Sequence, residues 1–335
     1  MTLPALATSG LGVIAALAVV LGLAVVIAEP RAEARARAAE AASPPSGQFV
    51  TVDGLRVHAR VQGDGPWAGP DIVLIHGASG SLRDFTFDLA DRLAADWRVI
   101  AFDRPGMGFS DTPAHGADNP ARQAAILRAA ATELGVRRPL VLGHSYGGAV
   151  AMAWALDALD RPDAGADPAA LVLLAGATHP WPGDLGLWYR LTASPLGQRA
   201  VIPLVAAFAP ETRAKPVVDG IFAPQPAPDG YAAYMNLGLA LRLGQLRVNA
   251  LQVNGLKPHV EAMAPRYPDL SLPIEILHGT EDTIVGLPIH SARMAQEVAS
   301  AALTPLPGLG HMPHHADPEA TLAAIDRAAR RAGLR

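Results

Sequence analysis

One short motif in the sequence has the residue types and spacing that nucleophilic catalysis requires. Gly143-His144-Ser145-Tyr146-Gly147 stands between an apolar segment and a second apolar segment that favours a helix. In a G-x-S-x-G motif the serine occupies a sharp, strained turn from a strand into a helix, and small flanking residues let the backbone pass close to its neighbours. The start of that helix directs free N–H groups and the positive end of its dipole at the reaction centre. The motif therefore predicts that Ser145 is a nucleophile.

A serine hydroxyl is a weak nucleophile at neutral pH, so it needs a general base. The chain has 11 histidines, and His311 is favoured because it follows the last expected strand on the glycine-rich segment 308–313. From that position an imidazole can reach back over the carboxyl edge of a sheet. His314 and His315 are the close alternatives, and they are interpreted as solvated residues.

The base in turn needs a carboxylate that orients it. Asp282 lies just past an expected strand end in Gly279-Thr-Glu-Asp282, and it is predicted to be this acid. Glu281 is the alternative and is interpreted as a solvated loop charge. Ser145, Asp282 and His311 follow one another along the chain in the order nucleophile, acid, base, which is the order expected for a strand-to-helix serine motif.

A third segment, Leu74-Ile-His-Gly-Ala-Ser79, directly follows another expected strand. Acyl transfer passes through a tetrahedral oxyanion that needs two preorganised N–H donors, each worth about 3–4 kcal/mol. The backbone N–H groups of Ala78 and Tyr146 are predicted to be this pair. His76 and His144 adjoin glycines and are interpreted as packing or supporting residues.

Apolar segments that suit strands alternate with segments that suit helices from about residue 49 onward. This alternation predicts an α/β fold with a mainly parallel sheet covered by helices on both faces. A hairpin that turns at Asp53-Gly54 precedes the alternation. The expected strands are 49–52, 55–61, 71–75, 98–102, 140–142, 171–174, 274–277 and 303–306, and the expected helices are 82–95, 123–134, 147–159, 288–298 and 318–329.

The alternation is interrupted by a proline-rich, mostly helical segment, which predicts a helical cap insertion at residues 178–270. Aromatic side chains are concentrated there, and most of them suit the insertion's own small core. A lid over a pocket would use a few of them. The aromatic residues of the insertion are Trp181, Trp188, Tyr189, Phe208, Phe222, Tyr231, Tyr234 and Tyr267.

Five motifs in this order along the chain resemble those of the α/β-hydrolase superfamily, in its capped branch. The resemblance covers about residues 49–330 and leaves the amino-terminal segment unmatched. The motifs are His76-Gly77, Asp103-Arg-Pro-Gly-Met-Gly-Phe-Ser110, Gly143-His-Ser-Tyr-Gly-Gly148, Gly279-Thr-Glu-Asp282 and Gly310-His311.

The resemblance implies the α/β-hydrolase fold for residues 48–335, with Ser145 as nucleophile and His311 as base. It further implies Asp282 as acid and a structural role for the segment 103–110. The backbone N–H groups of residues 78 and 146 would form the oxyanion hole.

The function implied is that of a serine hydrolase that forms an acyl-enzyme, most simply a carboxylesterase or lipase-like enzyme acting on a small hydrophobic ester. Epoxide hydrolases and haloalkane dehalogenases resemble this chain but place an aspartate where Ser145 stands, which disfavours both. Carbon–carbon bond hydrolases and cofactor-free perhydrolases use the same three residue types and stay as alternatives. A binding protein of this fold without catalytic activity is the remaining alternative.

The amino-terminal segment 1–28 contains an unbroken apolar run at 11–28. As a helix this run would span about 27 Å, close to the ~30 Å hydrocarbon core of a bilayer, so it predicts a single-pass transmembrane anchor. Residues 29–47 would be a juxtamembrane linker, and the arginines at 31, 35 and 37 would place the catalytic domain in the cytoplasm. A cleaved signal peptide, which implies a secreted or periplasmic protein, is the alternative.

The overall composition limits the other classes of function. Half of the 335 residues are hydrophobic, 17% are charged and the net charge is −4, so a large core is expected and no basic face for nucleic acid. The absence of cysteine excludes disulfides, thiolate metal sites and a cysteine nucleophile. No metal or other cofactor is predicted, because the spacing of histidines and carboxylates resembles no known ligand set.

Overall fold

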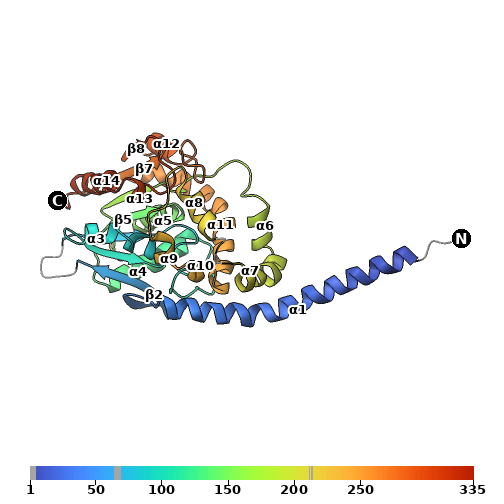
Figure 1. Ribbon diagram of the computed structural model, residues 1–335. Helices are drawn as coiled ribbons and strands as arrows, with labels where there is room; N and C mark the ends of the chain where they lie inside the picture. The colour runs from blue at the N-terminus through green and yellow to red at the C-terminus, as the bar shows by residue number, and fades with distance from the viewer. Residues whose placement is uncertain (1–4, 64–68, 211, 213) are drawn as a thin grey trace.

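The structure is a computed structural model that describes residues 5–63, 69–210, 212 and 214–335, with only the backbone described for most of 5–21. Its centre is an eight-stranded sheet with the strand order β1-β2-β4-β3-β5-β6-β7-β8 (Figure 1). The pairs β1–β2 and β2–β4 are antiparallel, and all other neighbouring strands are parallel. The strands are β1 (Gln48–Val52), β2 (Leu55–Gln62), β3 (Asp71–Ile75), β4 (Arg98–Phe102), β5 (Leu140–His144), β6 (Ala170–Leu174), β7 (Ile274–Gly279) and β8 (Ala301–Leu306).

The predicted α/β fold with a mainly parallel sheet is confirmed, and its physical cause is burial on both faces. Every residue of β5, β6 and β7 is buried, which explains why these strands are mostly apolar and do not alternate with exposed polar residues. Two separate hydrophobic cores lie on the two faces of the sheet. One core includes side chains of α4 (Pro120–Glu133) and α5 (Tyr146–Asp160), and the other includes side chains of α3 (Leu89–Leu93) and α14 (Pro318–Arg331).

The helices α4 and α14 each begin at a side-chain N-cap followed by a proline. The Asn119 side chain accepts a hydrogen bond from the Ala121 N–H at the start of α4, and Asp317 does the same for Ala320 at the start of α14. In both helices a proline stands at the first position, where its missing N–H has no cost. These caps fix where the chain turns away from the sheet edge.

The described residues between β6 and β7 are mostly helical and pack together beside the sheet (Figure 1). The longest helix of this segment, α11 (Leu243–Met263), runs against the loops that follow β3 and β4. Shorter α-helices precede it: α6 (Leu187–Ala193), α7 (Ile202–Phe208), α8 (Ala214–Phe222), α9 (Tyr231–Met235) and α10 (Leu237–Ala240). The other short α-helices in the described part of the chain are α2 (Arg83–Thr86), α12 (Ser291–Glu297) and α13 (Pro313–Ala316).

The amino-terminal helix α1 (Ala5–Ala42) extends from the body of the molecule in Figure 1 and then packs along it. Its Ala28 and Ala32 are buried against Ala206 and Ala207 of α7. The Arg31 Nε donates to the Ala207 carbonyl at 2.9 Å, and Arg35 donates to the Ala206 carbonyl at 3.1 Å. The end of α1 is therefore part of the folded protein.

The prediction of a single-pass membrane anchor at residues 1–28 was wrong, and so was the cytoplasmic localisation that depended on it. Across the part of the chain that the structure describes, no helix combines the length and apolar character needed to cross a bilayer. Much of segment 1–28 lies outside the residues whose side chains are described. The physical reason is that the apolar run does not end as a separate span. It continues, as one 38-residue helix, into an arginine- and glutamate-rich half that bonds to the protein.

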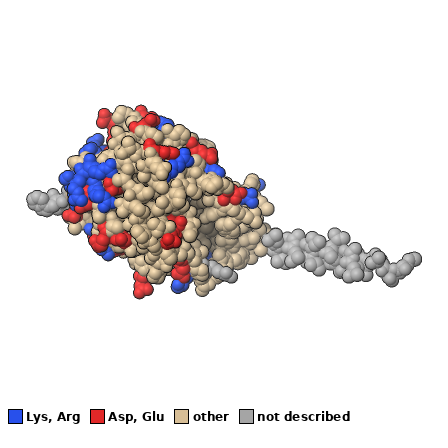
Figure 2. Space-filling model, turned by 90° about the horizontal axis from the view of Figure 1, so that it is seen from above, with Lys and Arg blue, Asp and Glu red and all other residues tan. Residues whose placement is uncertain are grey.

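The surface carries charges of both signs. On the face shown in Figure 2, basic and acidic side chains lie scattered around a broad uncharged area. Ion pairs between residues four apart in the sequence, such as Arg92–Asp88 and Arg293–Glu297, bring charges of opposite sign together.

Candidate active site

Ser145 occupies the turn between β5 and α5, at the carboxyl edge of the parallel sheet. Its backbone angles are φ 53° and ψ −118°, a region that non-glycine residues rarely adopt. The strain is held in place because the Ser145 N–H donates to the Leu174 carbonyl at 2.9 Å, and the Ser145 carbonyl accepts from Gly148 and Ala177. The turn places Ser145 at the carboxyl edge of the sheet, where the residue is largely buried.

The glycines of the motif are there because backbone passes where a Cβ atom would stand. A Cβ at Gly143 would collide with the Gly147 carbonyl, and one at Gly147 would collide with the Ile75 carbonyl of β3. Both neighbours are backbone, so neither can move aside without shifting a strand or helix. The close approach of α5 to β3 also brings the loop after β3 next to Ser145.

Asp282 and His311 are brought together by the loops after β7 and β8. The His311 Nδ1 lies 2.7 Å from the Asp282 Oδ2, and both residues are buried. The other carboxylate oxygen, Oδ1, accepts from the N–H groups of Ile284 and Val285 at 2.8 and 2.9 Å. Asp282 is therefore fixed in position by its own loop and presents its Oδ2 to the imidazole.

The Asp282 carboxyl is ionised in this setting. Burial by itself would raise its pKa, but hydrogen bonds with His278 and His311 and from the Val285 N–H hold that pKa well below its usual range. His278 was not singled out in the sequence, although its Nε2 lies 3.1 Å from the Asp282 Oδ2. Because its Nδ1 also lies 2.6 Å from the Ser291 hydroxyl, His278 is held rigidly behind the carboxylate.

His144, the residue before Ser145 in the chain, contacts His311. The His144 Nε2 donates to the His311 carbonyl at 3.0 Å, and the two rings lie 4.9 Å apart between centroids. Among the described residues, neither the Ser145 hydroxyl nor the His311 Nε2 has a side-chain hydrogen-bond partner. Catalytic hydrogen bonds in unliganded enzymes are often long and shorten when substrate binds. The supporting role expected for His144 agrees with this contact.

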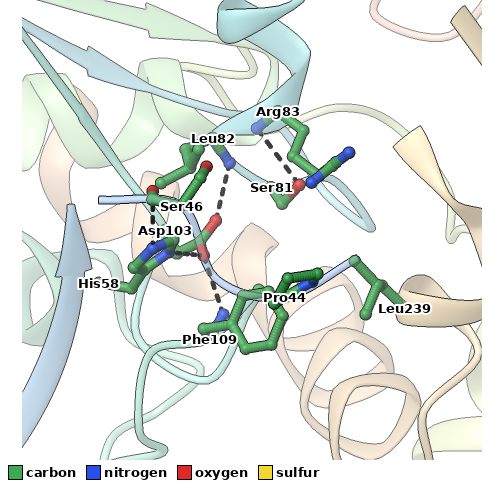
Figure 3. Close-up of a pocket in the computed structure, with 10 residues that line it drawn as sticks. Pro44, Ser46, His58, Ser81, Leu82, Arg83, Asp103, Phe109 and Leu239 are labelled. Atoms are coloured by element: carbon green, nitrogen blue, oxygen red, sulfur yellow. Dashed lines mark hydrogen bonds and ion pairs between the residues drawn. The ribbon is translucent and has the colours of Figure 1, made fainter. Parts of the chain in front are cut away.

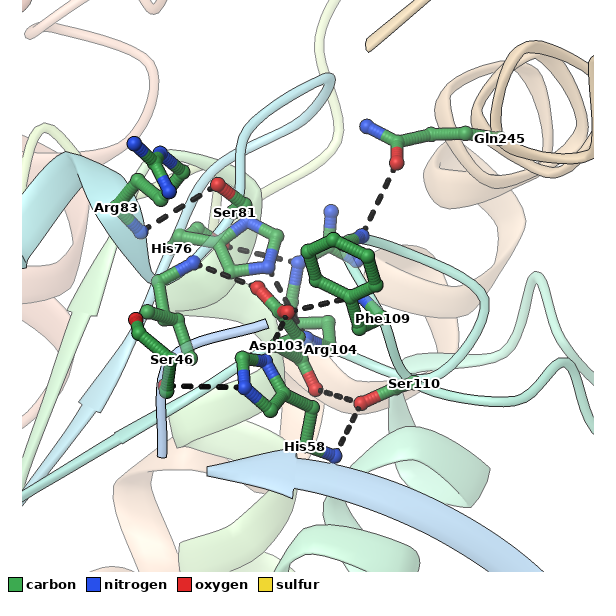
Figure 4. Close-up of polar contacts among 12 residues, drawn as sticks. Ser46, His58, His76, Ser81, Arg83, Asp103, Arg104, Phe109, Ser110 and Gln245 are labelled. Atoms are coloured by element: carbon green, nitrogen blue, oxygen red, sulfur yellow. Dashed lines mark hydrogen bonds and ion pairs between the residues drawn. The ribbon is translucent and has the colours of Figure 1, made fainter. Parts of the chain in front are cut away.

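The protein has a second Asp–His pair, which offers a direct comparison. The His58 Nδ1 lies 2.7 Å from the Asp103 Oδ2, the same distance as in the first pair. However, the His58 Nε2 lies 3.1 Å from the Ser46 carbonyl, which can only accept a hydrogen bond. Both ring nitrogens of His58 are therefore already in contact with an oxygen atom, and neither is free to contact a serine hydroxyl. Figure 4 shows this closed set of contacts.

Asp103 serves the fold, as the resemblance implied for segment 103–110. Its carboxylate accepts from the N–H groups of Leu82 and Phe109 at 2.7 and 2.8 Å. Burial would raise its pKa, but the hydrogen bond with His58 keeps that pKa below its usual range. The cavity beside it has a volume of about 10 Å³, enough for one water molecule and no substrate (Figure 3).

The loop after β3 places Ala78 beside the serine turn. A Cβ atom at Gly77 would lie 3.1 Å from the Ser145 Cβ, so this loop and the turn are in contact. Tyr146 is the first residue of α5, where backbone N–H groups have no partner within the helix. The predicted oxyanion donors, the N–H groups of Ala78 and Tyr146, thus belong to two segments that adjoin Ser145.

The interpretation of His314 and His315 as solvated was wrong, because both side chains are buried against Asp84. Their Nε2 atoms lie 3.2 and 2.9 Å from the Asp84 carboxylate, which also accepts from the Tyr231 hydroxyl at 2.8 Å. Burial would raise the pKa of Asp84, but the two histidines hold it well below its usual range. No spacing in the sequence could have revealed the cluster, because its members come from three distant segments.

The Asp84 cluster fits a carboxylate held by three donors better than it fits a metal centre. A metal-bound imidazole almost always donates its second N–H to an acceptor. The Nδ1 atom of the buried His314 has no such partner among the residues described. The Asp84 oxygens already accept three hydrogen bonds, so we assign a structural role to this cluster.

Comparisons with known proteins agree with this geometry. Residues 72–325 match the model of the alpha/beta hydrolase family. An uncharacterized protein of Mycobacterium tuberculosis is 30% identical over 306 residues, which cover 85% of this chain and 81% of that protein. A 2-hydroxy-6-oxononadienedioate/2-hydroxy-6-oxononatrienedioate hydrolase of Klebsiella pneumoniae is 30% identical over 138 residues, or 39% of this chain and 45% of that protein.

The crystal structure of an esterase from Rhodococcus sp. is similar with a TM-score of 0.65 and 26% identity, covering 86% of this chain and 99% of that one. Because the family model matches more than half of the chain, and the sheet order and strained serine turn accompany it, this chain belongs to the alpha/beta hydrolase family and is a hydrolase.

Proposed function

We propose that the protein is a serine hydrolase in which Ser145, His311 and Asp282 act as a catalytic triad. The observation that carries the proposal is the Asp282–His311 contact, which lies on the loop edge where the strained Ser145 turn also lies. The Asp282 carboxylate accepts from the Nδ1 N–H, which would leave the Nε2 lone pair available to take the serine proton. His58, by contrast, has no nitrogen free for this task.

The mechanism follows from these positions. The His311 Nε2 takes the hydroxyl proton as the Ser145 oxygen attacks the substrate carbonyl, and the Asp282 carboxylate stabilises the imidazolium that forms. The imidazolium then gives the proton to the leaving group, which leaves an acyl-enzyme on Ser145. A water molecule, activated by the same imidazole, attacks this ester and regenerates the serine.

The oxyanion formed in each tetrahedral intermediate is assigned to the N–H groups of Ala78 and Tyr146. Two features support this assignment: the loop after β3 touches the Ser145 turn, and α5 begins at Tyr146. The positive end of the α5 dipole adds to the stabilisation of negative charge at this point.

The substrate class proposed is a hydrophobic ester, with residues 178–270 acting as the cap over it. The supporting observations are the similarity to the Rhodococcus esterase and the helical segment between β6 and β7 that lies against the loops of the site. A carbon–carbon bond hydrolase is the second candidate, because the Klebsiella pneumoniae relative hydrolyses an oxo-dienedioate. Both reactions would use the same three side chains.

The experiment is hydrolysis of a series of p-nitrophenyl esters by the wild-type protein and by Ser145→Ala. We expect the turnover by the wild type to rise with the hydrophobicity of the acyl group. In Ser145→Ala the turnover should fall by at least about 10³-fold. Ordinary turnover by the variant would rule out Ser145 as the nucleophile. Turnover of 2-hydroxy-6-oxononadienedioate in preference to all esters would replace the esterase assignment by the second candidate.

A further inference from the structure

Arg104 is a fully buried cation whose hydrogen bonds all go to neutral groups. Its Nε donates to the His76 carbonyl at 2.9 Å and one terminal nitrogen donates to the Gly77 carbonyl at 3.0 Å. The other terminal nitrogen donates to the side-chain oxygens of Gln123 and Gln252 at 2.8 and 2.7 Å. Burying a charge that no carboxylate contacts directly is expensive, so its retention points to a task beyond packing.

The charge persists at neutral pH. Burial lowers the pKa of Arg104 to about 10, which still leaves the guanidinium protonated in the pH range of ordinary assays. The proposed site therefore has a permanent positive charge immediately behind the loop that follows β3.

The contacts of Arg104 fix the peptide that carries the Ala78 N–H. The Gly77 carbonyl accepts from Arg104 and, at 2.8 Å, from the His76 Nδ1, while the His76 Nε2 accepts from the Arg104 N–H at 3.0 Å. In a trans peptide the C=O and N–H groups point in opposite directions. With the Gly77 carbonyl directed at Arg104, the Ala78 N–H is directed away from it, and the loop that carries it touches Ser145.

The next peptide of the loop is fixed from the opposite side by the helix α11. The Ser79 N–H donates to the Asn249 side-chain oxygen at 2.7 Å. Asn249 and Gln252 are three residues apart and lie on one face of α11, so the same helix face holds both Arg104 and the loop. Among the described residues the Ala78 N–H itself has no hydrogen-bond partner.

We propose that Arg104 and Asn249 are positioning residues of the oxyanion hole, which hold the Ala78 N–H toward the substrate oxygen. The charge on Arg104 also polarises the Gly77–Ala78 peptide, because a cation bound to the carbonyl draws electron density from the N–H. The donor is thereby preorganised and strengthened before the oxyanion forms. This inference rests on the proposed function, since it assigns a role within the same reaction.

The first test compares Arg104→Met, Arg104→Lys and a control, Arg128→Met. Arg128 is equally buried but contacts Asp157 and Asp167, far along the chain from the loop. We expect Arg104→Met to lose about 10- to 100-fold in kcat with KM changed less than about twofold, because positioning acts on the transition state. Arg104→Lys should recover part of kcat, and Arg128→Met should lower Tm without lowering kcat.

A second variant covers the case in which Arg104→Met does not fold. Asn249 is only partly buried, so Asn249→Ala should fold and still lose kcat, by about tenfold. For each folded variant we would also measure affinity for a trifluoromethyl ketone, which forms a tetrahedral adduct with an active serine. The affinity should fall by the same factor as kcat.

The outcomes separate this inference from the proposed function. One outcome is that the wild type turns over substrate and that kcat is unchanged in Arg104→Lys, in Asn249→Ala and in any folded Arg104→Met. This outcome would overturn the positioning role but not the assignment of the protein as a serine hydrolase. A loss of kcat in Arg128→Met equal to that in Arg104→Met would overturn it too, because general destabilisation would then explain both. A wild-type protein with neither turnover nor adduct formation would remove the proposed function, and this inference with it.

Discussion

The Asp282–His311 and Asp103–His58 contacts have the same length, 2.7 Å, so distance alone does not distinguish a catalytic pair from a structural one. The difference lies at the far nitrogen of each ring. The His58 Nε2 faces a backbone carbonyl, whereas the His311 Nε2 has no such contact among the described residues. A general base needs an accessible lone pair, and only His311 meets this condition of the two.

The carboxylate beside His311 gives the first prediction. Asp282→Ala should lower kcat by about 10³- to 10⁴-fold, because the imidazole loses the partner that sets its tautomer and stabilises its charge. The neighbouring Glu281 is exposed and provides the control, so Glu281→Gln should keep full activity. Steady-state kinetics with one p-nitrophenyl ester decides the matter. If Glu281→Gln lost more kcat than Asp282→Ala, the acid of the triad would be Glu281 and not Asp282.

Buried neutral histidines give the second prediction, on stability. Burial, with Arg104 nearby, lowers the pKa of His76 to about 4, and burial, with His179 nearby, lowers that of His290 to about 3. An unfolded chain protonates its histidines near pH ~6.5. Below that pH the unfolded state binds more protons than the fold, so the free energy of unfolding falls as pH drops from about 6.5 toward 4.

Urea unfolding across this pH range measures the slope. The amide oxygen of His290→Asn can replace the His290 Nδ1 as acceptor of the His179 N–H. We expect this variant to reduce the slope by up to about 1.4 kcal/mol per pH unit, the value for one proton. A slope identical to that of the wild type would show that His290 is not held neutral by the fold.

Site residues could be predicted from the sequence where the structural requirement for them lies within one short motif. A Cβ at Gly143 would collide with the Gly147 carbonyl, so this part of the requirement lies within five consecutive residues. Arg104, His278 and the Asp84 cluster were missed, because their polar partners are brought together only by the fold. Arg104 bonds to Gln252, His278 contacts Ser291, and Asp84 contacts His314. Such long-range polar contacts leave no periodic pattern.

At the scale of elements, the strands were predictable because a parallel sheet buried on both faces forces continuous apolar runs. All eight strand segments expected from the sequence occur in the sheet. The polar contacts of α11 were not predictable, since its bonding residues look like an ordinary solvated face. Gln245, Asn249 and Gln252 bond to Gly108, Ser79 and Arg104, so this helix is fixed to the core and does not act as a free lid.

The close approach of α5 to β3 gives the third prediction. Gly147→Ala would place a Cβ against the Ile75 carbonyl, so strand and helix must separate and Tm should fall by several degrees or folding should fail. Gly244→Ala on α11 is the matched control, because no atom lies within 4 Å of its added Cβ. There alanine should stabilise the helix by up to about 1 kcal/mol. Thermal unfolding of the pair tests the contrast, and equal Tm values would contradict it.

At the scale of the whole molecule, the error over the amino-terminal segment has a clear cause. The membrane anchor was predicted from the apolar run at residues 11–28. The helix, however, continues to Ala42, and its polar half is hydrogen-bonded to α7. Glu29 pairs with Arg247 at 2.6 Å and Glu40 with Arg242 at 2.8 Å, which adds contacts to α11 and the residue before it. A local apolar count cannot show that a later part of the same helix docks on a distant surface.

The docking of α1 gives the fourth prediction. Arg31→Ala combined with Arg35→Ala removes both side-chain bonds to α7, so hydrogen exchange at the backbone amides of residues 28–42 should become faster. Arg37→Ala is the control, because Arg37 lies exposed on the same helix and, among the described residues, pairs with Glu33 alone. Activity should be unchanged in both proteins. Unaltered exchange in the double variant would mean that these bonds do not hold the helix.

The measurement closest to the central claim is labelling by a fluorophosphonate, followed by identification of the modified residue by mass spectrometry. Only a serine activated by a base reacts with this reagent at a useful rate. We predict one label, on Ser145, that is retained in Glu281→Gln and whose rate of formation falls by at least about 10²-fold in folded His311→Ala. Absence of the label from the folded wild-type protein, or its presence at full rate in His311→Ala, would contradict the account.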